Sequence, residues 1–189
     1  ETAKFWKDLS NVSMRGSTNW HFDDVNKAIE FGQADLGITI SGLVGALEDP
    51  KESKVAGKLG YAALPYKNRP FGTLSVWNWC VTADGKHPRE AYQLAAWLTS
   101  KATERKLSQK NGQISARQSV LKDPELIAKS PWLPAVSEAL TNAGTQPRTK
   151  NAPKLMDAME SALSRIAAGN ADPQKELETV QAQLAADFP

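Results

Sequence analysis

Apolar positions recur at helical spacing near the start of the chain. Ala3, Trp6 and Leu9 lie on one face of a helix if the spacing of 3.6 residues per turn is applied. Further on, two acidic residues at 23 and 24 precede an apolar stripe, and Gly32 follows it. Acidic residues favour the first turn of a helix and glycine favours its end. The pattern therefore predicts two short helices before residue 32.

In the second half of the chain, apolar residues recur at the same helical spacing almost without interruption. Pro88 suits the first turn of a helix, and Asn111 with Gly112 suits a left-handed cap. Asp172 followed by Pro173 is typical of an N-cap and the first helical position. We expect helices over residues 88–99, about 101–110, a short stretch near 123, 130–144, 152–169 and from 173 onward.

Between these helical regions lie apolar runs that favour β-structure. The segment 35–42, DLGITISG, predicts a short buried strand, and the segment 59–65 predicts another that stops at its proline. The segment 73–83, TLSVWNWCVTA, predicts a strand in which Trp77 and Trp79 share a face, because side chains alternate along a strand. We expect paired strands over 61–82, and an α/β architecture with helices in the majority.

Composition narrows the classes of protein that fit. The chain has 189 residues, 41% of them hydrophobic, and 23 basic against 21 acidic residues give a formal net charge of +2. The basic residues are scattered, so nucleic acid is not an expected partner. No stretch approaches the ~18 consecutive apolar residues of a membrane span, and residues 1–20 lack the order of a signal peptide. Glu1 in place of Met suggests a processed product or a piece of a longer protein.

Residues that could catalyse a reaction or hold a metal are few. His21 and His87 are the only histidines, and neither belongs to a metal-ligand spacing such as HExxH. Cys80 is the only cysteine, which excludes an internal disulfide; it is either a nucleophile or, as we expect, an inert hydrophobe in a strand. The common phosphate-binding and acyl-transfer motifs are absent. We expect no catalytic residue, no metal and no cofactor.

The order of these segments resembles a known family. The stretch FDDVNKAIEFGQADLGITISGLVGALEDPKESKVAGKLGYAALP, the tryptophan segment, HPREAYQLAAWLTSKATERKLSQKNGQISARQSVL and NAPKLMDAMESALSRIAAGNADPQKELETVQAQL follow one another as in extracellular, or periplasmic, solute-binding proteins of ABC importers. The likeness is to the sugar- and polyol-binding group that includes maltose-binding protein. It covers nearly all of the chain and corresponds to the C-terminal half of that family.

The resemblance implies a fold and a division of the chain. The fold is α/β, the C-terminal half of the type II periplasmic-binding-protein-like fold, helix-rich with a few short strands. Residues 1–74 would form part of the C-terminal lobe, residues 75–112 would cross the hinge and pack with the N-terminal lobe, and residues 113–189 would return to the C-terminal lobe. The missing N-terminal lobe would be a partner. Without it, we expect the chain to be a fragment or a swapped oligomer, and to self-associate.

The resemblance also implies residues that bind a ligand. Trp77 and Asn78 match a Trp-Asn pair at the edge of the family's cleft, where an indole can stack on the apolar face of a sugar or polyol. Core packing is the alternative for Trp77, and Trp79 is expected to lie deeper, as core. Arg117 either points into the cleft, where its planar fork suits paired hydroxyls or a carboxylate, or is an exposed loop arginine.

Other matched positions point to a small ligand. Ser41 and Gly42 match the turn at the mouth of the cleft, but Leu43 and its neighbours stand where the family often has Pro and Trp. Met156 falls where maltose binders place another aromatic residue. Both departures remove stacking rings, so a large carbohydrate is disfavoured and a smaller solute is expected.

Two functions from different classes follow. The first is the substrate-binding component of an ABC transporter, without enzymatic activity. It would capture a small solute, a sugar or polyol, in a cleft between lobes and deliver it to the membrane permease subunits. Its location would be periplasmic or extracellular, associated with the membrane through the transporter. The second is a non-catalytic, helix-rich protein interaction domain in which the tryptophans are core or contact a protein partner.

Overall fold

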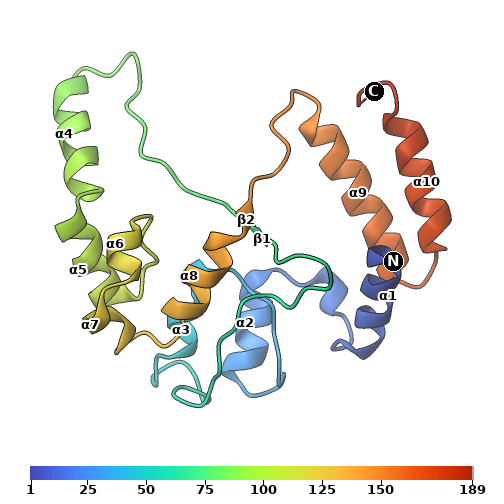
Figure 1. Cartoon of the computed structure of the whole chain (residues 1–189), viewed down its shortest axis with the longest axis horizontal. Coiled ribbons are helices and arrows are strands. Elements are labelled where there is room, and N and C mark those ends of the chain that lie inside the picture. Colours follow the sequence, from blue (N-terminus) through green and yellow to red (C-terminus); the bar gives the residue numbers. More distant parts are fainter. Residues whose placement is uncertain (189) are drawn as a thin grey trace. The chain divides into compact units, whose positions relative to one another are not determined.

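The computed structural model describes residues 1–188 and is rich in helices, with a few short strands (Figure 1). This confirms the predicted fold class. The chain forms two compact units: unit 1 contains residues 1–21 and the residues from 146 onward, and unit 2 contains residues 22–145.

Unit 1 is a small helical assembly. It contains α1 (Thr2–Val12), the short 3-10 helix η1 (Ser17–Asn19), α9 (Ala152–Ala167) and α10 (Pro173–Leu184). Helices α9 and α10 lie side by side, and α1 packs on them (Figure 1). Their facing stripes form a core of Ala162, Val180 and Leu184, against which Met159 and Phe188 pack. The predicted helices of this unit are confirmed.

Local signals set the ends of these helices. The Asp172 side chain accepts hydrogen bonds from the backbone N–H groups of Gln174 and Lys175, so it caps α10 as predicted. These two N–H groups, that of Lys175 first, hold the pKa of the Asp172 carboxyl below its usual value of 3.8. Gly169 follows α9 with a φ of 76°, a left-handed conformation that ends the helix.

Unit 2 begins with α2 (Phe22–Glu30), the 3-10 helix η2 (Ser41–Leu43) and α3 (Val44–Leu47). It continues with β1 (Gly72–Thr73), α4 (Pro88–Leu98) and α5 (Lys101–Asn111). Its last elements are α6 (Gln118–Leu121), α7 (Pro124–Ile127), α8 (Leu133–Thr141) and β2 (Ala143–Gly144). Helices α2, α4, α5, α7 and α8 agree with those predicted from the sequence, whereas the one-turn helices α3 and α6 were not predicted.

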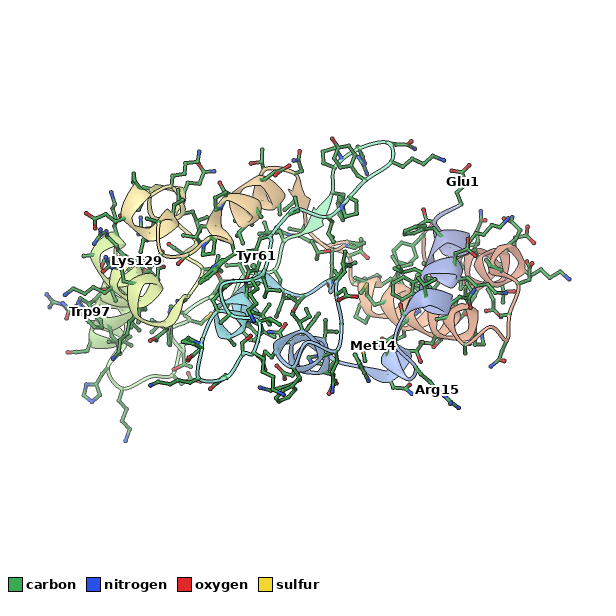
Figure 2. The ribbon with its side chains drawn as sticks, turned by 90° about the horizontal axis from the view of Figure 1, so that it is seen from below. Glu1, Met14, Arg15, Tyr61, Trp97 and Lys129 are labelled. Carbon is green, nitrogen blue, oxygen red and sulfur yellow. The ribbon has the colours of Figure 1, made fainter. Side chains whose placement is uncertain are left out.

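The core of unit 2 gathers residues from its short helices. Its buried members are Val44, Val120, Leu121, Leu126, Trp132, Leu133 and Val136, and Tyr61 packs against them from a coil segment. The Tyr61 ring meets Trp132 edge to face, with centroids 6.1 Å apart. Burial, together with a 2.5 Å hydrogen bond to Glu48, raises the pKa of the Tyr61 hydroxyl, which therefore stays neutral at physiological pH. Figure 2 shows Tyr61 among the other side chains of this unit.

Close backbone approach explains the end of α5. Gly112 has a φ of 67° and caps the helix, as predicted from the Asn-Gly pair. A Cβ at this position would lie 3.3 Å from both the Cα of Gly45 and a ring carbon of Trp132. Glycine here therefore allows the left-handed conformation and also lets α3 and the core tryptophan lie against the cap.

The predicted strands are wrong. The segments 35–42 and 59–65 contain no strand, and of 73–83 only Thr73 belongs to one. Within residues 1–188 the sheet consists of β1 and β2, paired in parallel with Gly72 opposite Ala143 and Thr73 opposite Gly144. The apolar runs are β-prone, but a strand exists only where a neighbour accepts its ladder hydrogen bonds. These runs have no such neighbour in the described chain.

Candidate functional site

Trp77 lies on the long segment that connects β1 to α4, drawn in green in Figure 1. The segment is anchored at its start, where Leu74 N–H donates to the Gly144 carbonyl oxygen at 2.8 Å. The next backbone hydrogen bond along the segment lies at its far end, where Gly85 N–H donates to the Thr82 carbonyl oxygen at 3.2 Å. The Trp77 side chain between these anchors is 98% exposed, and Asn78 is exposed as well. Within this chain, Trp77 is thus a surface residue.

The neighbours of Trp77 correct two expectations. Trp79 was expected in the core but is 66% exposed. Cys80 was expected in an apolar strand, but it is an exposed free thiol. The reason is the same for both residues: the segment is not paired as a strand, so neither of its faces is covered within unit 2.

Ser41, Gly42 and Leu43 form η2, a turn fixed by a buried amide. The Asn26 side chain, 4% exposed, donates from Nδ2 to the Leu43 carbonyl oxygen at 2.9 Å. Its Oδ1 accepts a 2.8 Å hydrogen bond from the Thr39 hydroxyl. Ser41 and Gly42 are exposed and Leu43 is half-buried. The position of this turn is therefore set by α2, through a residue that sequence reasoning missed. The signal was a polar Asn inside an apolar helical stripe.

Arg117 makes a structural hydrogen bond through Nε, while its terminal nitrogens stay available as hydrogen-bond donors. Its Nε donates to the carbonyl oxygen of Thr99, the residue that ends α4, at 2.8 Å. Glu104 Oε1 lies 4.0 Å from the same Nε, and the other oxygen of that carboxylate accepts from the Ser115 hydroxyl. The Arg117 side chain is 48% exposed, and among residues 1–188 its two terminal nitrogens make no hydrogen bond or ion pair. The guanidinium is thus oriented by α4 and α5 while its outer edge faces solvent.

Met156 belongs to unit 1, on α9, and is 41% exposed. The other six predicted ligand residues belong to unit 2. Within unit 2, over the described residues, no hydrogen bond, ion pair or ring contact joins Trp77 or Asn78 to the η2 turn or to Arg117. The structure thus places Trp77, the turn and Arg117 on separate elements of one unit.

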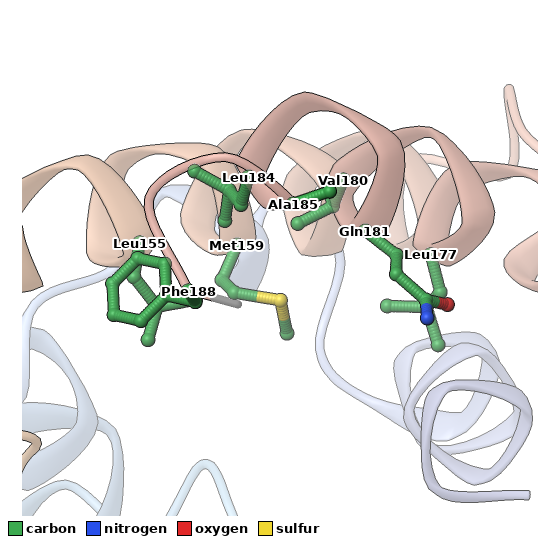
Figure 3. A pocket seen from close by; sticks show the side chains of 8 residues that line it. All are labelled: Leu155, Met159, Leu177, Val180, Gln181, Leu184, Ala185 and Phe188. Atoms are coloured by element: carbon green, nitrogen blue, oxygen red, sulfur yellow. The ribbon is translucent and has the colours of Figure 1, made fainter.

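A hollow of about 580 Å³ lies in unit 1 between α9 and α10 (Figure 3). None of the predicted ligand residues lines it. Its wall is apolar apart from one amide, and consists of Leu155, Met159, Leu177, Val180, Gln181, Leu184, Ala185 and Phe188. Most of these residues also form the core of unit 1, so the hollow is a solvent-exposed part of that core.

The described residues contain neither a metal-binding cluster nor a membrane-spanning helix. Among residues 1–188, no group of three or more His, Cys, Asp or Glu side chains is arranged to hold a metal ion. Within the same residues, none of the helices has both the length and the apolar character needed to cross a membrane.

Comparison with known proteins defines the class. The family model of bacterial extracellular solute-binding proteins matches residues 1–135, and the chain belongs to this family. A probable amino-acid ABC transporter periplasmic-binding protein of Sinorhizobium fredii is 32% identical over 173 residues, which are 88% of this chain and 39% of that protein. A probable ABC transporter-binding protein of Deinococcus radiodurans is 30% identical over 138 residues, which are 70% of this chain and 33% of that protein.

Solved structures give the same fold. Maltose-bound MalE3 of T. maritima superposes on 98% of this chain with a TM-score of 0.86 and 22% identity, and the match covers 49% of that protein. A solute-binding protein of Agrobacterium radiobacter in complex with ribitol gives a TM-score of 0.81 and 26% identity, with the same two coverages of 98% and 49%. The chain thus has a periplasmic-binding-protein-like fold and spans less than half the length of these relatives.

Proposed function

We propose that the chain contributes to the substrate-binding component of an ABC importer, capturing a small sugar or polyol in a cleft between lobes for delivery to a membrane permease. Membership of the solute-binding family supports the transport role, and this family is not enzymatic. The ribitol and maltose carried by the two structural neighbours support a polyhydroxyl solute. The proposal places the protein outside the cytoplasmic membrane, bound to it through the permease, with a second lobe closing on the solute.

The observation that carries the proposal is the exposure of Trp77. An indole that is 98% exposed has almost no protein contact, so its whole face is available to a ligand. The apolar C–H face of a sugar or polyol fits against such a ring and leaves the hydroxyl groups free for hydrogen bonds. Asn78 beside the ring and the outer edge of Arg117 would supply polar partners.

The proposed solute is small. Ser41, Gly42 and Leu43 would border the cleft without an aromatic ring on which a larger carbohydrate could stack. With Trp77 as the stacking residue, one sugar ring or a short polyol is the size that fits.

A second candidate solute is an amino acid. The Sinorhizobium relative, 32% identical, is named as a probable amino-acid transporter component. A free guanidinium edge on Arg117 suits a carboxylate, which accepts two parallel hydrogen bonds from such a fork. The two candidates differ at Trp77, because a polyol requires the ring and an α-carboxylate requires the arginine.

Solute titrations followed by the indole N–H resonances of the tryptophans test the proposal. We expect ribitol or a single-ring sugar such as glucose to shift the Trp77 signal, assigned by its loss in Trp77→Phe, with an affinity in the millimolar range or weaker. The affinity is low because one half of a two-lobed site offers only part of the contacts. L-Glutamine should leave that signal unchanged. A shift with L-glutamine alone, abolished in Arg117→Gln, would replace the sugar by an amino acid; no shift with any of the three contradicts both.

A further inference from the structure

The carboxylate of Glu104 is fixed close to the Arg117 guanidinium. Glu104 lies in the first turn of α5, and its side chain is 11% exposed. Its Oε2 accepts a hydrogen bond from the hydroxyl of Ser115, a residue that is 3% exposed. The same hydroxyl oxygen accepts from the backbone N–H of Arg117 at 3.0 Å. Ser115 therefore connects the carboxylate to the backbone of the arginine that it faces.

Glu104 acts on the Arg117 side chain through its charge and not through a hydrogen bond. The single hydrogen on Arg117 Nε is donated to the Thr99 carbonyl oxygen at 2.8 Å, and Glu104 Oε1 lies 4.0 Å from that nitrogen. A separation of 4.0 Å is too long for a hydrogen bond but close for two opposite charges. Because Glu104 is largely buried, solvent screens its charge less than that of a surface carboxylate.

The outer edge of Arg117 suits two kinds of solute group, which differ in charge. Paired hydroxyls and a carboxylate can both accept two hydrogen bonds from the guanidinium fork. A carboxylate held there by hydrogen bonds of ~2.9 Å would stand roughly one Debye length from Glu104, about 8 Å at physiological ionic strength, and would be repelled by it. Hydroxyl groups carry no net charge and meet no such repulsion. The pair Glu104–Arg117 therefore favours an uncharged solute.

We propose that Glu104 makes this site select uncharged polyhydroxyl solutes over acids of the same size. The inference rests on the proposed function, in which the outer edge of Arg117 faces the solute. Within residues 1–188, Glu104 is the acidic side chain that lies within 4.0 Å of this guanidinium. Arg117 then serves as an oriented pair of hydrogen-bond donors for a polyol, and a carboxylate is a poor solute group at this edge.

Titrations of the full chain with ribitol and with ribonate test the selectivity. These two five-carbon solutes differ at one end, which is a hydroxymethyl group in ribitol and a carboxylate in ribonate. Both are titrated at neutral pH and equal ionic strength and are followed by the Trp77 indole resonance. We expect the parent chain to bind ribitol about fivefold more tightly than ribonate, because like charges oppose each other at the site. Equal affinities, or tighter binding of ribonate, overturn the proposal.

Removal of the Glu104 charge separates this effect from packing. Glu104→Gln keeps an acceptor oxygen for the Ser115 hydroxyl, and should raise the affinity for ribonate relative to ribitol by about fivefold. Lost packing alone would weaken both solutes together and leave their ratio unchanged. Glu104→Asp, which keeps the charge, should retain the preference for ribitol. Glu52→Gln is the matched control, because Glu52 is exposed in the same unit and its charge acts on Lys27.

Failure of this inference and failure of the proposed function give different results. If neither solute shifts the Trp77 signal, the proposed function fails and the inference fails with it. If ribitol binds but Glu104→Gln leaves the ratio of the two affinities unchanged, the inference alone is overturned. Circular dichroism shows whether Glu104→Gln is folded; if it is not, the comparison of ribitol with ribonate on the parent chain decides.

Discussion

The helices and the extended segments of this chain differ in how far their side chains are buried and their backbone groups paired within the single chain. In unit 1, Ala162 and Ile166 on α9 are fully buried by neighbouring helices. In unit 2, Leu36 is 80% exposed and Trp77 is 98% exposed, each on a segment without a strand partner. A helix satisfies its backbone hydrogen bonds internally, whereas an extended segment needs another chain segment or a ligand. The contrast indicates that packed helices such as α9 carry the stability, and we expect the extended segments to contact a further chain segment or a ligand.

Leucine-to-alanine variants should show the largest difference between the two regions. Leu126→Ala removes a side chain that is 1% exposed in the core of unit 2, and should cost ~2–5 kcal/mol of unfolding free energy through lost burial and a cavity. Leu36→Ala makes the same chemical change at a side chain that is 80% exposed, and should cost ~0.5 kcal/mol or less. Urea unfolding at low protein concentration measures both. Similar costs would contradict the comparison.

Glycine-to-alanine variants sharpen the comparison within the extended regions. Gly37→Ala places a methyl group 2.4 Å from Ile29 Cδ1, so the contact with α2 must open, at a cost of ~1–3 kcal/mol. Gly60→Ala meets no atom within 4 Å and should be neutral or slightly stabilising. Thermal unfolding of the two variants distinguishes a segment fixed on a helix from one in open space. A neutral Gly37→Ala would show that 35–40 is not held by α2.

A smaller effect concerns the cap of α10. The pKa of Asp172 is lower in the folded chain than its usual 3.8, so the ionised cap contributes stability above pH 3.8. This contribution is lost as the pH falls through the lowered folded value. Asp172→Asn keeps the acceptor oxygen without the charge, and should therefore flatten this part of the acid unfolding curve while changing the melting temperature little at pH 7. An unchanged acid profile would show that the carboxylate charge is irrelevant to the cap.

The helices could be predicted because their signals are local. Asp172 with Pro173 and Asn111 with Gly112 specify helix ends within a few residues, and all these ends are confirmed. The strand predictions for 35–42 and 59–65 were wrong because alternating apolar residues report β-propensity, while pairing depends on a partner elsewhere.

Sequence comparison predicted some residues of the candidate site but not the residues that orient them. The resemblance located Trp77, Arg117 and the 41–43 turn, whose role as ligand residues stays a prediction. It did not locate Asn26 or the contact between Glu104 and Ser115, which orient those groups. Glu104 and Ser115 are 11 residues apart in the sequence, and no local pattern connects them.

The most direct test of the account is the affinity for a polyol when the exposed ring is removed. Trp77→Ala should weaken binding of ribitol, or of whichever solute shifts the Trp77 signal, by ~1–3 kcal/mol, the scale of a lost stacking ring. Its unfolding free energy should change by ~0.5 kcal/mol or less, because the side chain is 98% exposed. Trp97→Ala, which removes an exposed indole from α4 (Figure 2), is the matched control and should leave the affinity unchanged. Equal affinity of Trp77→Ala and the parent chain in a calorimetric titration would contradict the account.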